Sequence, residues 1–148
     1  MSGTLSEELF EHVLIPVASE ADARTARETI LPYLEGVGGV ATVVHVVEQT
    51  EGGVDPSPPS MQEEDARELF EIVSDDHAGL VVETRAAYGS DIVESVFEVA
   101  REVDASAVVF SPEEKSRLIR LLTGDTALRL VTNPDLPVLA LPRRDSTG

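Results

Sequence analysis

The chain has 148 residues, a length typical of one domain and sufficient to bury a hydrophobic core. It contains no cysteine, which excludes disulfide frameworks, thiolate zinc sites and a cysteine nucleophile. Its 28 acidic residues outnumber its 11 basic ones, and the resulting net charge of −17 repels nucleic acid and anionic membranes. We therefore expect neither as a partner.

The composition also bears on the cellular environment. A surface rich in carboxylates and poor in lysine suits concentrated salt, where the screening length falls to about 3 Å at 1 M. We expect a halophilic protein, with an ordinary acidic protein as the alternative. The amino terminus lacks an apolar signal core, and the uncharged stretch Gly36–Val47 is far shorter than the roughly 20 residues of a membrane helix. These features predict a cytoplasmic location.

The charge is unevenly distributed along the chain. Residues 1–114 carry 5 basic and 25 acidic side chains, whereas residues 115–148 carry 6 basic and 3 acidic ones. The net charges of the two parts are −20 and +3, which sum to −17. A site for an anion is therefore expected in the last quarter of the chain.

Five short apolar runs predict five strands. Continuous runs of Val, Leu and Ile, as opposed to alternating ones, are typical of strands buried on both faces of a parallel sheet. In the third run, Glu83 and Arg85 place charges on one face, which indicates an edge strand guarded against pairing. The runs are Val13–Val17, Val40–Val47, Leu80–Ala87, Ala107–Phe110 and Val138–Leu141.

Helical patterns lie between the predicted strands. Ser19 followed by Asp22 predicts a capping box at the start of the first helix. Pro32 is expected to bend or shorten this helix, which then ends at Gly36, Gly38 and Gly39. Ser60 with Glu63 predicts a second capping box, before a helix with one apolar face formed by Ala66, Leu69, Phe70, Val73 and His77.

Two further helices follow the third and fourth runs. Gly89 and Ser90 are expected to start one whose apolar face is formed by Val93, Val96, Phe97, Ala100 and Val103. The other covers roughly Glu113–Val131, with a possible break at Gly124. We expect a single domain over residues 1–148, with an ordered core at about 10–142, a mobile Gly/Pro-rich loop at 49–60 and a disordered tail at 143–148.

Strict alternation of strands and helices predicts an α/β fold, an open five-stranded parallel sheet with helices on both faces. Ligands of such sheets bind beyond the carboxyl ends of the strands, where the strand order reverses. The candidate segments are therefore Pro16–Ser19, the end of the second strand near Val46, and Ser111–Thr126.

These segments contain no recognisable catalytic constellation. His12, His45 and His77 have no carboxylate or serine at a motif spacing, so we interpret them as structural. The acidic runs at 63–65 and 75–76 lie on predicted helix surfaces or ends. We interpret them as solvent-exposed charges, so no metal is expected. A phosphorelay receiver would need carboxylates after the first and third strands, where Ala18-Ser19 and Ala87-Tyr88 stand. We expect no enzyme activity.

Three segments together resemble the universal stress protein family. They are VLIPVASE at the start, VVHVVE at the end of the second strand, and the run from VVFSPEEK to VLALP. The resemblance covers nearly the whole chain and implies a Rossmann-like α/β/α sandwich with strand order 3-2-1-4-5. It also implies a role in stress adaptation.

Nucleotide-binding members of that family carry a glycine-rich motif after the fourth strand, in which backbone N–H groups approach the phosphates. Here the spacing is kept but the residues differ. Ser111 and Glu114 replace the first two glycines, Gly124 is retained, and Asp125 replaces a hydroxyl residue, with Thr126 next. Ala18 stands where the resemblance implies an aspartate that contacts the ribose.

The substituted carboxylates oppose nucleotide binding. One carboxylate about 4 Å from a phosphate charge costs about 4 kcal/mol at an effective dielectric constant of 20. Two of them would cancel the roughly 8 kcal/mol of micromolar binding. We therefore expect a degenerate nucleotide site without a tightly bound cofactor, although Lys115, Arg117, Arg120 and Arg129 make the segment locally basic.

Two alternatives remain. The chain could be an ATP-binding switch, with Pro16, Val46 and Phe110 around the adenine and Ser111, Gly124 and Thr126 near the phosphates. It could instead hold a smaller anion or metabolite at Arg117 and Arg120.

The preferred hypothesis is a dimeric interaction or regulatory module with a protein partner. The resemblance implies dimerisation through the last strand, Val138–Leu141, and an unpaired edge strand favours a twofold contact. Folding back of the tail onto that strand is the competing explanation.

Overall fold

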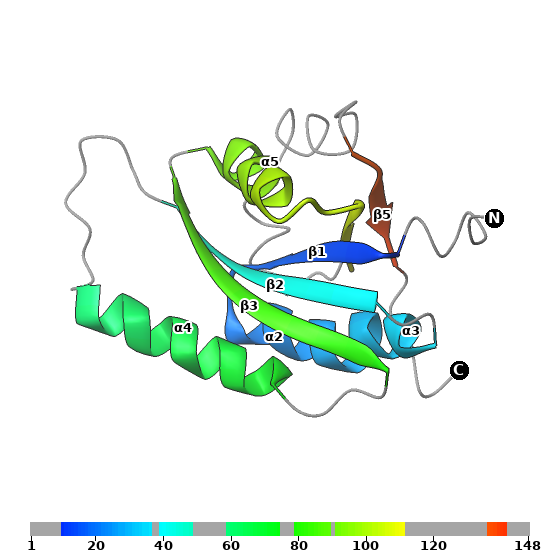
Figure 1. Ribbon diagram of the computed structural model, residues 1–148. Helices are drawn as coiled ribbons and strands as arrows, with labels where there is room; N and C mark the ends of the chain where they lie inside the picture. The colour runs from blue at the N-terminus through cyan, green and yellow to red at the C-terminus, as the bar shows by residue number, and fades with distance from the viewer. Residues whose placement is uncertain are drawn as a thin grey trace.

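Five parallel strands form one sheet in the order β3-β2-β1-β4-β5, as the computed structural model shows (Figure 1). The structure describes residues 10–36, 39–48, 59–74, 79–89, 91–111 and 136–141. The strands are β1 (His12–Val17), β2 (Gly39–Glu48), β3 (Leu80–Gly89), β4 (Ala107–Phe110) and β5 (Val138–Ala140). The helices are α2 (Glu20–Thr25), the π-helix η1 (Ala26–Ile30), α3 (Leu31–Glu35), α4 (Pro59–Val73) and α5 (Ile92–Glu102). The predicted fold class and strand order are confirmed.

Helices cover both faces of the sheet. In Figure 1, α2, η1, α3 and α4 lie on one side of it and α5 on the other. Successive strand residues point to opposite faces, so each central strand contributes to two cores. In β1, Leu14 packs with α5, whereas Val13 and Ile15 pack with the helices opposite. All three are fully buried, which explains the continuous apolar runs in the sequence.

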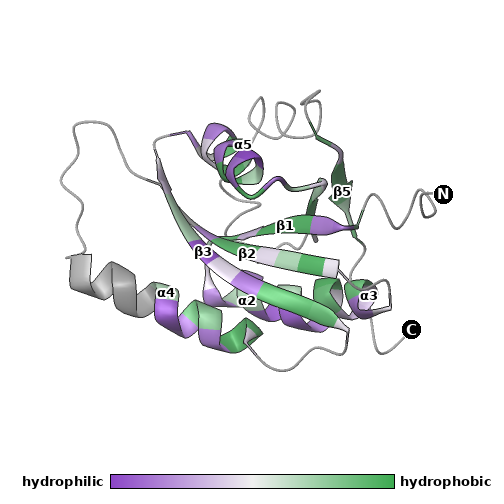
Figure 2. Ribbon diagram, viewed as in Figure 1, coloured by the Kyte–Doolittle hydropathy of each residue, from purple (hydrophilic) through white to green (hydrophobic). Residues whose placement is uncertain are grey.

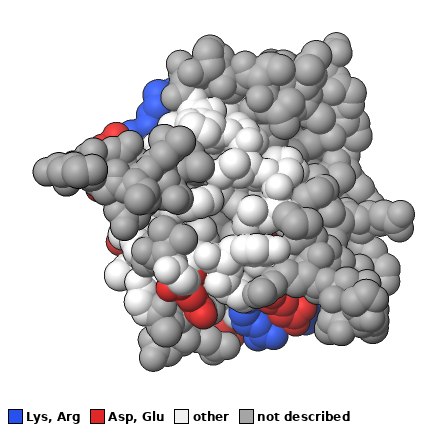
Figure 3. All heavy atoms as spheres, turned by 90° about the vertical axis from the view of Figure 1, so that its right-hand side faces the viewer, with Lys and Arg blue, Asp and Glu red and all other residues white. Residues whose placement is uncertain are grey.

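The register fixes which strand ends are neighbours. β1 pairs with β2 from His12 opposite Val40 and with β4 from Val13 opposite Ala107. β3 pairs with β2 and forms one edge, and β5 pairs with β4 and forms the other. The prediction of β3 as an edge strand with exposed Glu83 and Arg85 is confirmed. Figure 3 looks onto the amino ends of the strands, where the charged side chains drawn lie mainly toward the margin.

The first helical segment contains the predicted irregularity. The regular helix α2 ends at Thr25, and the π-helix η1 follows it. The Leu31 N–H reaches back five residues to the Ala26 carbonyl, and Pro32, which has no N–H to donate, comes next in α3. The helix thus continues through Pro32 at the expense of its regular hydrogen bonding, and it ends at Gly36.

Two predicted helix starts are wrong. Gly89 is the last residue of β3, and α5 has Asp91 as its N-cap, whose Oδ1 accepts a hydrogen bond from the Glu94 N–H at 3.1 Å. An acidic cap outcompetes glycine because its side chain satisfies a free amide of the first turn. α4 begins at Pro59, so Ser60 is helical and not the N-cap. Proline suits a first helical position because its N–H is not needed there.

Several predicted segments lie outside the described residues. They are residues 49–58 of the predicted loop, His77, the helical region Glu113–Val131 and the tail at 143–148. Within the part of the chain that the structure describes, no helix is long and apolar enough to cross a membrane.

Two glycines provide a matched test of backbone constraint. Gly39 has a φ of +99°, and a Cβ there would lie 2.7 Å from the Glu11 carbonyl oxygen. Gly36 has a φ of −72°, and a Cβ there would meet nothing within 4 Å. We predict that Gly39→Ala lowers the free energy of unfolding by about 1–3 kcal/mol, because it adds strain. Gly36→Ala should raise it by about 0.4–1 kcal/mol. Urea denaturation measures both, and equal effects would contradict this assignment.

Candidate functional site

The strand order reverses between β1 and β4, and their carboxyl ends lie side by side at the centre of the sheet. This is the position at which ligands of open parallel sheets bind. Pro16 is buried one residue before the end of β1, and Val46 lies two residues before the end of β2. Phe110 ends β4, and Ser111 follows it. Gly124 and Thr126 lie outside the described residues, as do Arg117 and Arg120.

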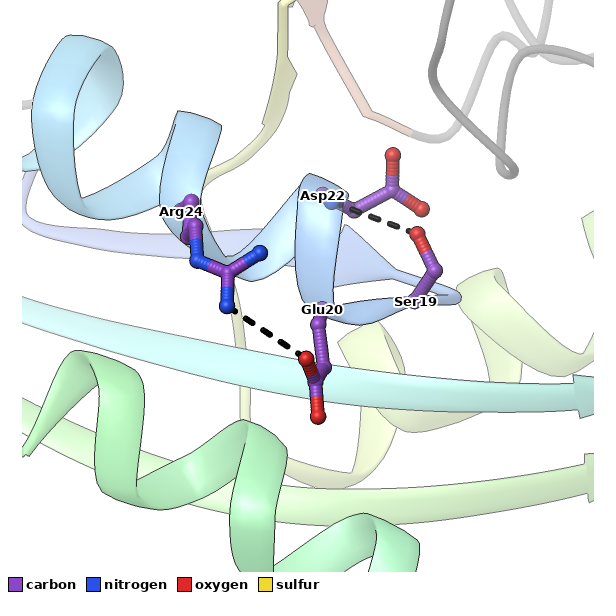
Figure 4. A network of polar contacts seen from close by, with 4 residues as sticks. All are labelled: Ser19, Glu20, Asp22 and Arg24. Atoms are coloured by element: carbon purple, nitrogen blue, oxygen red, sulfur yellow. Dashed lines mark hydrogen bonds and ion pairs between the residues drawn. The ribbon is translucent and has the colours of Figure 1, made fainter.

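In the turn after β1, side chains of the turn itself accept hydrogen bonds from its backbone N–H groups. Ser19 is the N-cap of α2, and its Oγ accepts a hydrogen bond from the Asp22 N–H at 3.3 Å (Figure 4). The Asp22 Oδ2 accepts in return from the Ala18 N–H at 2.8 Å. The predicted capping box is therefore present, but its return bond goes to the residue before the cap. Asp22 is 7% exposed, so this carboxylate is part of the buried structure.

This arrangement changes the electrostatics of the crevice. The start of a helix after a parallel strand ordinarily offers free N–H groups to an anion. Here the Ala18 amide donates to Asp22, and Glu20 and Asp22 place two acidic groups in the first turn. Glu20 forms an exposed ion pair with Arg24 at 3.4 Å, also drawn in Figure 4. The turn after β1 is therefore poorly suited to bind a phosphate.

In contrast to the turn after β1, the environment of Ser111 favours binding of a ligand. It lies directly beyond β4, is 7% exposed, and its buried Oγ has no hydrogen-bond partner among the described residues. A buried hydroxyl without a partner costs free energy, so such a group commonly meets a ligand, a water molecule or another part of the chain. Of the predicted site residues, it is the one whose environment in the structure most favours a binding role.

Phe110 has a structural role in addition to any contact with a ligand. It is 9% exposed and belongs to the core cluster on the α5 side of the sheet, together with Leu14 and Val93. A contact with a purine ring would use only the small exposed part of this side chain. Its role next to an adenine therefore stays a prediction.

Two histidines make contacts within the fold, and their interpretation as structural residues stays a prediction. The His12 Nε2 shares a hydrogen bond of 2.7 Å with the Thr42 Oγ1 on the neighbouring strand. His45 is 6% exposed, and its ring meets Phe70 of α4 edge to face at 6.4 Å between centroids. His45 also lines a cavity of about 200 Å³ at the carboxyl ends of β1 and β2, together with Ala18, Ser19, Glu20, Glu68 and Leu69.

A larger groove of about 570 Å³ lies away from the crevice, between α4 and the edge strand β3. It is mainly apolar and includes Phe70, Val82 and Tyr88. Across the described ranges, no three His, Asp or Glu side chains are grouped so that they could hold a metal ion. The sequence had pointed to neither the groove nor the Asp22–Ala18 bond, although the pattern Ser-x-x-Asp marked the turn.

Comparison with known proteins gives a consistent result. The model of the universal stress protein family matches residues 9–142. Among solved structures, a universal stress protein in complex with cAMP has a TM-score of 0.60 at 15% identity, with 90% of this chain and 98% of that chain covered. One from Archaeoglobus fulgidus in complex with dAMP has a TM-score of 0.59 at 18% identity, with the same coverage.

A third similar structure, a protein of this family from Burkholderia pseudomallei, has a TM-score of 0.62 at 22% identity. It covers 90% of this chain, and 97% of its own length is matched. No curated protein shows significant sequence similarity to the chain. At these identities the solved structures establish the fold.

Asp22 is the residue to vary in the turn after β1. We predict that Asp22→Ala lowers the free energy of unfolding by about 1–3 kcal/mol, because it removes the acceptor of the Ala18 amide and half of the capping box. Glu20→Ala is the matched control in the same turn and should cost less than about 1 kcal/mol, because its ion pair is exposed. Denaturation with urea measures both, and equal losses would show that Asp22 acts only as a surface charge.

Proposed function

Because the chain belongs to the universal stress protein family, we propose that it is a dimeric regulatory module of stress adaptation that has lost tight nucleotide binding. It acts through protein contacts and not by catalysis, and it holds no tightly bound cofactor. Its acidic, lysine-poor composition suits a cytoplasm with concentrated salt.

The observation that carries this proposal is the hydrogen bonding within the turn after β1. Where the resemblance implies an aspartate that contacts the ribose, this chain has Ala18, and the Ala18 N–H is bonded to Asp22. The motif after β4 departs in the same direction, because Glu114 and Asp125 bring acid groups to its phosphate-binding positions. The end of the crevice next to β4 thus carries negative charge where a nucleotide carries its own.

A second candidate, an ATP-binding switch, is favoured by one specific observation. The Ser111 hydroxyl, which has no hydrogen-bond partner among the described residues, lies directly after β4, beside β1, where a ligand could pair with it. Two of the similar solved structures contain adenine nucleotides. A small anion held by Arg117 and Arg120 is a weaker form of the same hypothesis.

Calorimetry separates the two functions. We predict no measurable heat when ATP and magnesium, or cAMP, are added to the chain in about 1 M KCl, a salt concentration that screens surface repulsion. The double variant Glu114→Gly with Asp125→Ser should gain binding, because it removes two carboxylates worth about 4 kcal/mol each beside a phosphate.

The matched control is Glu113→Gly with Asp135→Ser, which removes the same charges but changes none of the motif's glycine and hydroxyl positions, so it should not gain binding. Micromolar binding by the unmodified chain, lost on Gly124→Val, would establish the switch instead. Equal gains in the two double variants would show that net charge, and not the motif, prevents binding.

Dimerisation through β5 is tested at one backbone group. The Leu141 N–H bonds to the Phe110 carbonyl of β4, and the Val108 N–H bonds to the Pro137 carbonyl. Since alternate residues of a parallel strand point their backbone groups to opposite sides, Ala140 directs its N–H outward. We predict that Ala140→Pro lowers the average mass in sedimentation at micromolar concentration, whereas Ala140→Thr leaves it unchanged. An unmodified chain that sediments as a monomer would contradict dimerisation.

A further inference from the structure

In the edge strand β3, charged and apolar side chains follow in the same order on both sides of the central residue. Thr84 lies at the middle of Leu80–Tyr88, with Glu83 before it and Arg85 after it, and apolar residues fill both ends. Figure 2 shows this as a hydrophilic centre between hydrophobic ends. We propose that β3 of one copy pairs antiparallel with β3 of a second copy, about a twofold axis through Thr84.

The exposure of this strand supports an interface. β3 is hydrogen bonded to β2 alone among the described strands, so its other edge offers backbone donors and acceptors. Val81 is 57% exposed and Tyr88 is 44% exposed, and they are two of the three exposed large apolar side chains in the described part of the chain. The strand carries one acid and one base and is neutral, although the whole chain has a net charge of −17.

Pairing about Thr84 gives favourable neighbours along the whole strand. Each Glu83 lies opposite the Arg85 of the other copy, which forms two symmetric pairs of opposite charge. Val81 lies opposite Ala87 on the same face. On the face of the groove, Leu80 meets Tyr88, Val82 meets Ala86, and the two Thr84 side chains meet on the axis. Apolar, aromatic–aliphatic and Thr–Thr pairs of this kind stabilise antiparallel sheets.

The charges also exclude the neighbouring registers. Side chains stay on their own face only if the register shifts by an even number of residues. The nearest symmetric alternatives are centred on Glu83 or on Arg85, and each places two like charges directly opposite. Glu83 and Arg85 therefore guard the edge selectively: they disfavour these registers and allow the one centred on Thr84.

The neighbouring helices α5 and α4 favour this contact. The Arg85 guanidinium is held by the Glu102 Oε2 of α5 at 2.5 Å, while its side chain stays 43% exposed. A guanidinium has five N–H donors, so donors remain for the Glu83 of a second copy. On the other face, the groove of about 570 Å³ between β3 and α4 lies open beside Thr84 and Tyr88. The Tyr88 of the second copy would add apolar cover along this groove.

A single introduced thiol tests the register directly, because the chain has no cysteine and any disulfide must join two copies. Thr84→Cys should form a disulfide-linked dimer under mild oxidation, since opposed residues of antiparallel strands lie about 4.5–5.5 Å apart between Cα atoms, within disulfide range. Val82→Cys is the control, because its two thiols would lie about four residues, or roughly 13 Å, apart and should not join.

Charge reversal tests the pairs in solution. The Ala140→Pro background removes the contribution of the β5 edge, and sedimentation at the lowest salt that keeps the chain folded follows what remains. Glu83→Arg should weaken this self-association about tenfold, and so should Arg85→Glu, because each creates like-charge pairs. A mixture of the two variants should associate again, since every cross-strand pair then has opposite signs.

Three outcomes would overturn the proposal. They are a fully monomeric Ala140→Pro variant, a disulfide from Val82→Cys in preference to Thr84→Cys, and a Thr84→Cys product that contains a different protein. None of these bears on nucleotide binding, and a fully monomeric Ala140→Pro variant would agree with dimerisation through β5. The contact at β3 therefore stands or fails independently of the proposed function.

Discussion

The pairing of β1 with a parallel strand on each side is the constraint on which the rest of the structure depends. Val13, Leu14 and Ile15 are fully buried between two layers of helices, so β1 is fixed at the centre of the sheet. The strand order reverses beside it, and the turn after β1 and the end of β4 meet there. Among the described residues, the groups at that meeting point are Ala18, Asp22 and Ser111.

We propose that this chain keeps the fold of its family without a tightly bound nucleotide. The Asp22 carboxylate satisfies the Ala18 amide and so takes over a role that a ligand could play at this turn. The edges of the sheet are β3 and β5, and these are the surfaces through which we propose that the chain contacts other molecules.

The sequence predicted the fold well because the strands are buried on both faces. The continuous apolar runs identified all five strands, with ends that differ from those observed by at most two residues. Helix starts were harder, because a cap depends on which side chain reaches a free amide. Asp91, and not Gly89, caps α5, although Asp91 and Glu94 have a capping spacing that could have identified it. Strand periodicity correctly placed Pro16, Phe110 and Ser111 at the carboxyl ends of their strands, but it could not show that Asp22 bonds to Ala18.

The central claim is that this sheet has a crevice that does not retain a purine nucleotide. The most direct measurement is the nucleotide content of the chain purified in concentrated KCl without added ligand, released by denaturation and quantified by mass spectrometry. A site weaker than micromolar loses its ligand during purification, so we predict less than about one-tenth of an adenine nucleotide per chain. Release of close to one adenine nucleotide per chain would contradict the account.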